Sequence, residues 1–413
     1  MSTSEIDPVT ALIHHPYAPP AGFLAPQPGV FKASTVIFPS VAAMRTRNWK
    51  EKSGYTYGLH GTPTTFVLEE RIAALEGGRH CVLLPSGLAA IANVNMALLE
   101  AGDEVLIPDN AYGPNKALAE GELARWGITH QLYDALDPAD LQARITPRTR
   151  LVWLEAPGSV TMEFPPLAHQ AQICRQQGIT TALDNTWGAG LAFNGFDLGR
   201  GARFTPGSGA DIVVQALTKY PSGGGDVLMG SVVTRDEALH LKLKLTHMRL
   251  GWGIGANDAE AVLRALPSMA LRYRAQDKVA RALAAWLGQQ PQVAQVLHPA
   301  FEGSPGHAHW RALCTEDGQG AAPGLAAGLF SVIFDARYST AQVDAFCDAL
   351  RLFKLGYSWG GPVSLVVPYD LAAMRTAWPA HIARGTLVRF SVGLEAVADL
   401  RHDLQQALGA AYG

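Results

Sequence analysis

The sequence predicts an α/β protein with a mainly parallel, doubly wound sheet and a smaller C-terminal α/β domain. Short apolar runs typical of buried strands alternate with helical segments over much of the chain. The length of 413 residues exceeds that at which one hydrophobic core usually stops growing. Hydrophobic residues make up 48% of the chain and charged residues 17%, which is typical of a well-packed globular protein. We therefore expect at least two domains.

The first periodic segment lies behind a proline-rich stretch, so residues 1–60 are expected to form an arm. A helix is predicted from Thr64 to Glu76, because Gly77 and Gly78 are a typical helix end. Further helices are expected from 87, around 116–126 and around 167–177. Between them, strands are predicted at 81–84, 104–107, 151–154, 179–183 and 211–217. These elements place the large domain at 61–256.

A helix-rich connection at 257–290 opens the predicted C-terminal domain, residues 257–413. Alternating apolar residues predict strands at 329–334 and 387–392, with helices between and after them. The segment 315–328 is rich in glycine and alanine and is predicted to be a loop.

Charge and cysteine usage exclude several classes of function. The net charge of −3 and the lack of a Lys/Arg cluster argue against nucleic acid as a partner. The apolar runs are too short to span a membrane, and no secretory signal is expected at the N-terminus. The four cysteines are scattered, and His298, His307 and His309 lack partners at metal-ligand spacing. We expect a cytoplasmic protein without a metal site.

A lysine and an aspartate follow two of the predicted strands. Lys219 follows the apolar run 211–217 with only Thr218 between them, and Asp184 follows the run 179–183. Ligands of doubly wound sheets bind outside the carboxyl ends of the strands. A lysine in an apolar setting has a lowered pKa and forms Schiff bases, and a carboxylate stabilises a protonated pyridine nitrogen. Together they indicate a site for pyridoxal 5'-phosphate.

These segments together resemble the pyridoxal-phosphate enzymes of cysteine and methionine metabolism, which include cystathionine lyases and synthases. The resemblance extends from near Val30 to Leu404 and rests on segments 85–90, 184–187 and 216–220. It implies pyridoxal-phosphate fold type I, the aspartate-aminotransferase-like architecture, with a mainly parallel seven-stranded sheet. It also implies pyridoxal 5'-phosphate as the cofactor and a small amino-acid substrate.

The resemblance assigns a role to each matching residue. Catalysis is expected from Lys219, Tyr112 and Asp184. The expected cofactor-binding residues are Lys219, Asp184, Tyr112, Ser86, Gly87, Leu88, Thr218 and Tyr57. The expected substrate-binding residues are Arg389, Ser358, Trp359, Tyr357 and Tyr112.

Physical reasons accompany two of these roles. The turn at Ser86 joins a strand to a helix, whose first N–H groups and dipole suit a phosphate. Arg389 lies inside an apolar strand, where a guanidinium needs a partner. Its planar fork fits the α-carboxylate of an amino acid, and an internal ion pair with Asp or Glu is the alternative.

The segments 357–359 and 157–163 resemble bacterial cystathionine β-lyases. Relatives of the γ type tend to carry an acidic residue in place of Tyr357, and methionine γ-lyases carry a cysteine in place of Pro114. The resemblance therefore implies β-elimination of L-cystathionine to homocysteine, pyruvate and ammonia, in transsulfuration and methionine biosynthesis. The alternatives are a γ-type member, such as a cystathionine γ-lyase or γ-synthase, and a pyridoxal-phosphate-binding protein with little catalysis.

The segment 55–64 resembles the part of the family that reaches into a neighbouring subunit, where Tyr57 would contact the cofactor phosphate. A homo-oligomer is therefore expected, as a tetramer built from two active dimers. Two positions depart from the family pattern. Leu59 stands where relatives usually have an arginine, and Ala216 stands where they often have a serine.

Overall fold

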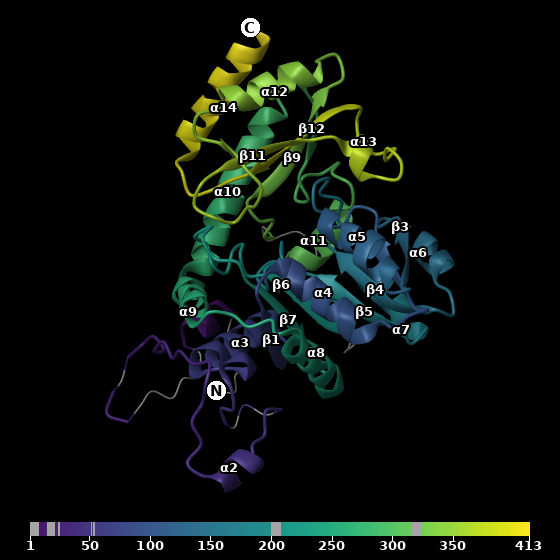
Figure 1. The fold of residues 1–413 in the computed structure, drawn as a ribbon. Coiled ribbons are helices and arrows are strands. Elements are labelled where there is room, and N and C mark those ends of the chain that lie inside the picture. Colours follow the sequence, from purple (N-terminus) through teal and green to yellow (C-terminus); the bar gives the residue numbers. More distant parts are fainter. Residues whose placement is uncertain are drawn as a thin grey trace.

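The computed structural model describes residues 8–14, 21–23, 25–50, 52, 54–199, 208–315 and 324–413. The proline-rich residues 16–20 of the predicted arm and residues 316–323 of the predicted loop lie outside these ranges. Two domains are visible, one above the other in Figure 1, and their facing ends form the site described below.

The large domain contains a seven-stranded sheet with strand order β1-β7-β6-β5-β4-β2-β3. Strand β7 is antiparallel to both β1 and β6, and the other neighbouring strands are parallel. The expected mainly parallel sheet is thus confirmed. The strands are β1 (His80–Leu84), β2 (Glu104–Pro108), β3 (Thr129–Tyr133), β4 (Thr149–Glu155), β5 (Thr180–Asp184), β6 (Ile212–Ala216) and β7 (Gly230–Thr234).

Helices cover both faces of this sheet (Figure 1). Successive strand residues point to opposite faces, so Val105 and Leu151 join one core while Leu106 and Val152 join the other. The first core contains α4 (Gly87–Leu98) and α8 (Glu237–Leu250), and the second contains α3 (Pro63–Glu76) and α7 (Leu167–Gln176). The remaining elements are α5 (Gly113–Leu118), which continues as a π-helical turn (Ala119–Leu123), α6 (Pro138–Arg144) and α9 (Ala256–Ala265).

The C-terminal domain is built on a five-stranded sheet with order β10-β11-β12-β9-β8. Fully buried aromatic rings fill its core, among them Phe330, Phe346 and Phe390. Its strands are β8 (Val293–Leu297), β9 (Leu329–Asp335), β10 (Lys354–Leu355), β11 (Leu365–Tyr369) and β12 (Gly385–Ser391). Its helices are α10 (Met269–Leu287), α11 (His307–Cys314), α12 (Thr340–Ala349), α13 (Leu371–Met374) and α14 (Val397–Tyr412).

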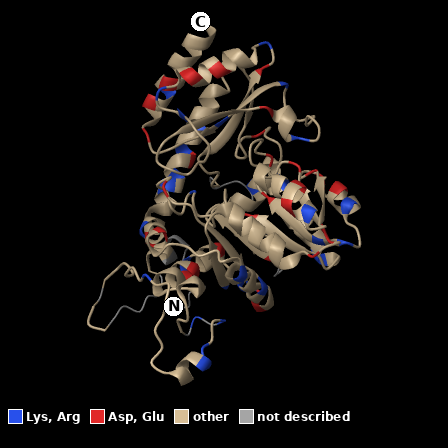
Figure 2. Ribbon diagram, in the orientation of Figure 1, with Lys and Arg blue, Asp and Glu red and all other residues tan. Residues whose placement is uncertain are grey.

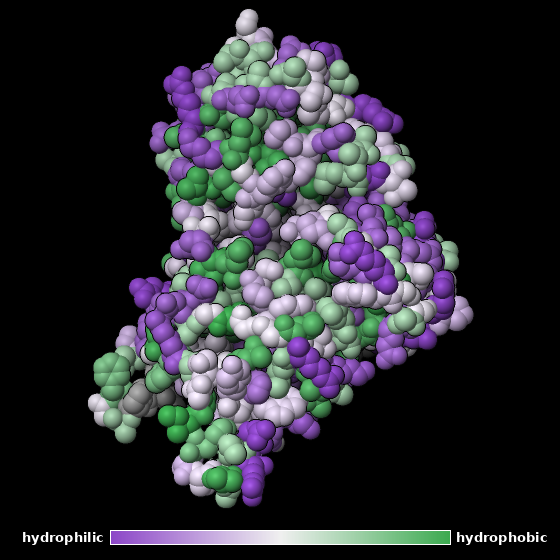
Figure 3. Space-filling model, in the orientation of Figure 1, coloured by the Kyte–Doolittle hydropathy of each residue, from purple (hydrophilic) through white to green (hydrophobic). Residues whose placement is uncertain are grey.

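The N-terminal segment projects from the large domain with several of its hydrophobic side chains uncovered. Helix α1 (Pro8–Ile13) packs against α3, whereas the stretch that carries α2 (Val41–Arg45) extends away from both domains (Figure 1). Ile37 is 90% exposed and Phe23 is 62% exposed. Green hydrophobic atoms are visible on this projection in Figure 3. Such uncovered apolar side chains are typical of a surface that another protein covers.

Charged residues of both signs are intermixed on the outer helices, while the strands carry few charges (Figure 2). Across the described ranges, no helix combines the length and the apolar character needed to cross a membrane.

Tyr220, in the turn after β6, connects the large domain to the C-terminal domain through ring contacts and a hydrogen bond. Its ring is fully buried and contacts the rings of Tyr273 and Trp359. Its hydroxyl oxygen accepts a hydrogen bond of 2.8 Å from the backbone N–H of Gly328, which precedes β9. The residue after Lys219 therefore helps to fix the distance between the two domains.

We predict that Tyr220→Phe lowers the free energy of unfolding by about 1–3 kcal/mol, since the buried Gly328 N–H loses its acceptor. Urea denaturation measures the change. Tyr55→Phe is the control, because Tyr55 is 43% exposed and exposed substitutions usually change stability by less than about 0.5 kcal/mol. Equal stability of the two variants would contradict the bridging role.

Candidate active site

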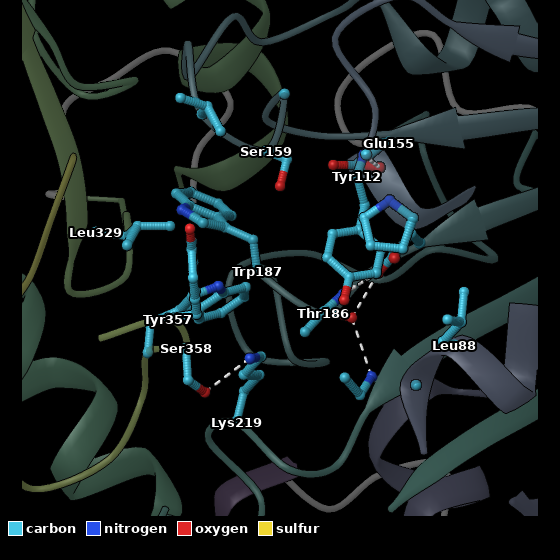
Figure 4. Close-up of a pocket in the computed structure, with 18 of the residues that line it drawn as sticks. Leu88, Tyr112, Glu155, Ser159, Thr186, Trp187, Lys219, Leu329, Tyr357 and Ser358 are labelled. Atoms are coloured by element: carbon cyan, nitrogen blue, oxygen red, sulfur yellow. Dashed lines mark hydrogen bonds between the residues drawn. The ribbon is translucent and has the colours of Figure 1, made fainter. Parts of the chain in front are cut away.

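A cavity of about 430 Å³ lies between the carboxyl ends of the large-domain strands and the C-terminal domain. Figure 4 shows side chains from both domains pointing into it. Most residues predicted for the site line this cavity. They are Ser86, Gly87, Leu88, Tyr112, Asp184, Thr218, Lys219, Tyr357, Ser358, Trp359 and Arg389. Tyr57 does not line the cavity of its own chain; it lies on the N-terminal arm and is 47% exposed.

Lys219 lies in the turn that follows β6, where its N–H bonds to the carbonyl of Ala216. Its Nζ donates a hydrogen bond of 2.7 Å to Ser358 Oγ, drawn as a dashed line in Figure 4. The same Nζ lies 5.4 Å from the centre of the Trp359 ring. Burial and, to a lesser extent, the charge of Arg389 lower the pKa of Lys219 to about 8, against the opposing effect of Asp184. A substantial fraction of this amine is therefore neutral near pH 8.

The loop that carries Ser358 has an unusual backbone. Ser358 has a φ of 107°, a value that non-glycine residues rarely adopt. Gly360 follows with a φ of 78°, and a Cβ there would lie 2.9 Å from the backbone nitrogen of Tyr220. Since only glycine permits this approach, the loop packs directly on the Lys219 turn and brings Ser358 to the amine.

Asp184 is the last residue of β5 and faces the floor of the cavity. Its Oδ1 accepts hydrogen bonds from the N–H and the hydroxyl of Thr186. The Thr186 hydroxyl oxygen in turn accepts from the N–H of Ala216, which ties β5 to β6. Burial raises the pKa of Asp184, while Thr186 and Lys219 oppose this effect. A cationic ring nitrogen near this carboxylate would offset the cost of its burial.

Glu155 ends β4 directly beside Asp184 and was not among the predicted site residues. Its Oε2 accepts a hydrogen bond of 2.8 Å from the N–H of Tyr112. Burial and the neighbouring Asp184 raise the pKa of Glu155 well above its ordinary value. The carboxyl thereby fixes the backbone of Tyr112 at the cavity wall. Its position at a strand end, like that of Asp184, is the sequence signal that would have identified it.

Tyr112 presents its phenol to the same cavity (Figure 4). Burial raises the pKa of Tyr112, and Asp184 and Glu155 raise it further against the opposing charge of Arg389. The hydroxyl therefore keeps its proton at neutral pH and can donate it in a hydrogen bond.

Arg389 lies in the middle of β12 and is 6% exposed. Its Nη1 donates to the backbone carbonyl of Ser159 at 3.2 Å, and its guanidinium lies 5.2 Å from the Tyr369 ring centre. No carboxylate among the described residues forms an ion pair with it. The alternative of an internal ion pair thus has no partner within these residues. A buried cation facing a cavity suits an anionic ligand.

The N-terminus of α4 also lines the cavity. Ser86 is the N-cap, and its Oγ accepts a hydrogen bond of 3.0 Å from the N–H of Ala89. The first N–H groups of the helix, beginning at Gly87, are suited to an anion. The Thr218 hydroxyl donates to the carbonyl of Met229 and accepts from its N–H. To bind an anion as well, it would have to share its proton between that carbonyl and the anion.

Comparisons with known proteins agree with this geometry. The family model of Cys/Met metabolism PLP-dependent enzymes matches residues 9–409. The chain belongs to this family. Cystathionine beta-lyase of Bordetella avium is 36% identical over the full length of both chains. A putative cystathionine beta-lyase of Rhizobium johnstonii is 38% identical, with 94% of this chain and 92% of the relative covered.

The fold agrees as well. The crystal structure of metB from Corynebacterium glutamicum has a TM-score of 0.85 to this chain, with 26% identity and 99% of both chains covered. The predicted family and the predicted fold type I are therefore confirmed. As a member of this family, the enzyme depends on pyridoxal phosphate (PLP).

The cavity residues fit that cofactor. Lys219 offers an amine, Asp184 offers a carboxylate that lacks an ion-pair partner among the described residues, and the α4 N-terminus offers backbone donors. These groups all line one cavity of about 430 Å³, a size within the range of small-molecule sites.

We predict that Lys219 in the cofactor-free protein reacts with trace acetic anhydride along a titration with its midpoint near pH 8, below the ordinary lysine value of 10.5. Below this midpoint the amine is protonated and unreactive. Mass mapping of the acetylated peptide gives the curve.

Two variants test whether the neighbouring charges shift the pKa of Lys219 as described. Asp184→Asn removes an anion and should lower the midpoint, whereas Arg389→Met removes a cation and should raise it. Shifts in the opposite directions would disprove this account of the electrostatics.

Proposed function

We propose that this enzyme catalyses β-elimination from L-cystathionine, in transsulfuration and methionine biosynthesis. L-cystathionine and water give L-homocysteine, pyruvate and ammonia. The observation that carries the proposal is the meeting of three groups at one cavity: the Lys219 amine, the Asp184 carboxylate and the guanidinium of Arg389, which has no carboxylate partner within the described part of the chain. The names of two relatives of similar length support the choice of reaction.

Bound PLP supplies an aldehyde carbon for an amine and a ring that accepts electrons from Cα of the substrate. The residues that would hold it are those predicted for it. Lys219 would bind at the aldehyde and Asp184 at the ring nitrogen, while the ring of Tyr112 would cover one face. Ser86, Gly87, Leu88 and Thr218 would bind the phosphate.

Arg389 binds the α-carboxylate of the substrate in this proposal. Its guanidinium is buried, and its contacts with the Ser159 carbonyl and the Tyr369 ring fix its direction. A planar fork held in this way binds a carboxylate through two parallel hydrogen bonds. Trp359, Ser358 and Tyr357 form the wall beside it and complete the substrate site.

Lys219 moves the Cα proton. Ser358 Oγ, 2.7 Å from Nζ, holds the amine in one place. A base works best when its pKa is close to the working pH, and the pKa of Lys219 is lowered to about 8. The Cα proton moves to Nζ first. The electrons left at Cα then form a double bond to Cβ as the bond from Cβ to sulfur breaks, and the thiolate leaves with the electrons of that bond. Tyr112 or protonated Lys219 then donates a proton to the thiolate.

The rival reading is a γ-type enzyme of the same family, which must also remove a Cβ proton. Tyr357 stands where the γ-type enzymes tend to have an acid, and it is 81% exposed at the cavity mouth. A tyrosine in that place favours the β reading. A protein that binds PLP with little catalysis is a weaker rival. That reading does not explain why Lys219, Asp184 and Arg389 all line the same cavity.

The enzyme is proposed to act as a homo-oligomer in the cytoplasm, assembled as a tetramer of two active dimers. The uncovered apolar arm and the absence of Tyr57 from the cavity of its own chain support a shared site. Cys81, Cys174 and Cys347 are buried as thiols, which suits a reducing compartment.

We predict that the PLP-loaded enzyme releases pyruvate and homocysteine from L-cystathionine in equal amounts. A coupled keto-acid assay combined with thiol titration measures both. 2-Oxobutyrate with cysteine would establish the γ reading, and absence of turnover in PLP-loaded protein would favour the binding protein. Lys219→Ala is the control and should lose at least about a hundredfold in rate, the lower end of what a positioned acid–base group contributes.

Co-expression of Lys219→Ala with Tyr57→Ala tests the shared site. Each variant alone should have little activity. In a mixed dimer one site has both native residues, so random assembly should restore about a quarter of wild-type activity. Activity is measured on separately tagged, doubly purified dimers as well as on the mixture. No gain over the single variants would place Tyr57 in the site of its own chain or outside any site.

A further inference from the structure

Three loops that form walls of the cavity meet at the carboxylate of Glu163, which lies behind those walls. The first loop, 109–112, follows β2 and carries Tyr112. The second loop, 157–163, follows β4 and carries Ser159. The third, the segment 375–381, directly follows Met374, the last residue of α13, which lines the cavity. Glu163 is 1% exposed and is not itself among the lining residues.

Each loop donates to this carboxylate. Asn110 Nδ2 donates to Oε2 at 2.9 Å, and the hydroxyl of Thr161 donates to the same oxygen. Arg375 Nη1 lies 3.2 Å from Oε1, and His381 Nε2 lies 2.9 Å from Oε1. Burial alone would raise the pKa of Glu163, but His381, Arg375 and the other donors hold it at about 2. The carboxylate is therefore ionised throughout the working range.

A chain of hydrogen bonds connects Asn110, which binds Glu163, to Arg389 through Ser159. The N–H of Ser159 donates to the backbone carbonyl of Asn110 at 3.0 Å, so loops one and two are joined at this point as well. The carbonyl of Ser159 accepts from Arg389 Nη1 at 3.2 Å. A change in the position of Asn110 therefore displaces the carbonyl that directs the guanidinium.

Arg375 differs from Arg389 in its charge partners. Its Nε bonds to Asp109 at 3.0 Å while its Nη1 bonds to Glu163, so one guanidinium joins loop three to loops one and two. Lys116 Nζ adds a second link, because it donates to the carbonyls of Asp109 and Met374. Arg375 is thus engaged in the wall and is not available to a ligand.

We propose that Glu163 is a positioning residue for substrate recognition: it holds the Asn110, Ser159 and Arg375 loops together and thereby directs Arg389 at the α-carboxylate. This inference rests on the proposed carboxylate-binding role of Arg389. Glu163 itself touches neither substrate nor cofactor in this scheme. Its loss should weaken the recognition of a carboxylate more than the chemistry at Cα.

Two ligands that differ only in the α-carboxylate separate positioning from general structural support. L-alanine carries the carboxylate and ethylamine lacks it, and neither has a leaving group on Cβ. Their binding to the PLP-loaded enzyme is followed by the change in cofactor absorbance. For Glu163→Gln we expect about tenfold weaker binding of L-alanine, since misplacement of a binding group by 1 Å can cost up to about a hundredfold. Ethylamine binding should change by less than about twofold.

Kinetics give a second readout. KM for L-cystathionine should rise about tenfold in Glu163→Gln while kcat falls by less than about threefold, as for the loss of binding made equally in ground and transition states. The control is Asp277→Asn. Asp277 is 5% exposed and pairs with Arg281 at 2.7 Å, so it matches Glu163 in burial and pairing but lies outside the cavity wall. Its loss should lower stability without changing the ratio of L-alanine to ethylamine affinity.

Arg389→Lys completes a double-mutant cycle. If Glu163 acts through Arg389, then Glu163→Gln adds little in the Arg389→Lys background. Should Glu163→Gln fail to fold, Arg375→Lys replaces it, because it keeps the charge and loses the fork that joins Asp109 to Glu163.

The outcomes are distinct. Equal weakening of both ligands, or fully additive effects with Arg389→Lys, would overturn the positioning role. If Arg389→Lys itself leaves L-alanine binding unchanged, the proposed carboxylate role of Arg389 fails, and with it the basis of this inference.

Discussion

The contact between Lys219 and Ser358 is the interaction on which the rest of the site depends. It joins the end of β6 in the large domain to a loop of the C-terminal domain, at 2.7 Å. Neither residue would reach the other without the close approach at Gly360, where a side chain would strike the backbone of Tyr220. The fully buried Tyr220 then fixes the same junction through Gly328. A single turn therefore sets both the position of the amine and the spacing of the domains.

The charges around that turn explain why the site is built at a domain boundary. Lys219, Asp184, Glu155 and Arg389 are all withdrawn from water, and burial is the largest influence on the pKa of each. Four such groups in one continuous core would destabilise it, since buried charges cost several kcal/mol unless paired. A cavity between two separately packed cores lets a ligand of opposite charge complete the pairing instead.

Much of this arrangement can be predicted from the sequence, and the parts that cannot have two physical causes. The strands β4, β5 and β6 contain apolar runs, and Asp184 and Lys219 lie at or just after strand ends, where a doubly wound sheet brings them together. The edge strand β3 was not predicted, because it contains Thr129, His130 and Gln131 and so lacks an apolar run. A strand with a neighbour on one side only can carry such polar residues.

Glu163 and Arg375 were not identified from the sequence for a different reason. They are 212 residues apart and meet through loops whose conformation no local pattern specifies. Glu155 could have been predicted from its position, since it ends β4 as Asp184 ends β5. Resemblance to the family supplied Arg389 and Ser358, whose partners Ser159 and Lys219 come from the other domain. Pairings between distant segments thus required the structure.

The distribution of cations within the cavity bears on assembly. Among its lining residues the cations are Lys219 and Arg389, and neither belongs to the α4 N-terminal end. A helix N-terminus carries only about half a positive charge, whereas a phosphate carries close to two negative charges at neutral pH. Ala216 offers no polar group there, and a Cβ on Gly87 would lie 2.6 Å from the Cβ of Ala216, so the two segments pack without room for a longer side chain. The described lining residues thus leave part of the phosphate charge without a cation beside it. In the proposed shared site, the arm of a neighbouring chain would add a hydrogen-bond donor, the Tyr57 hydroxyl, at this end of the cavity.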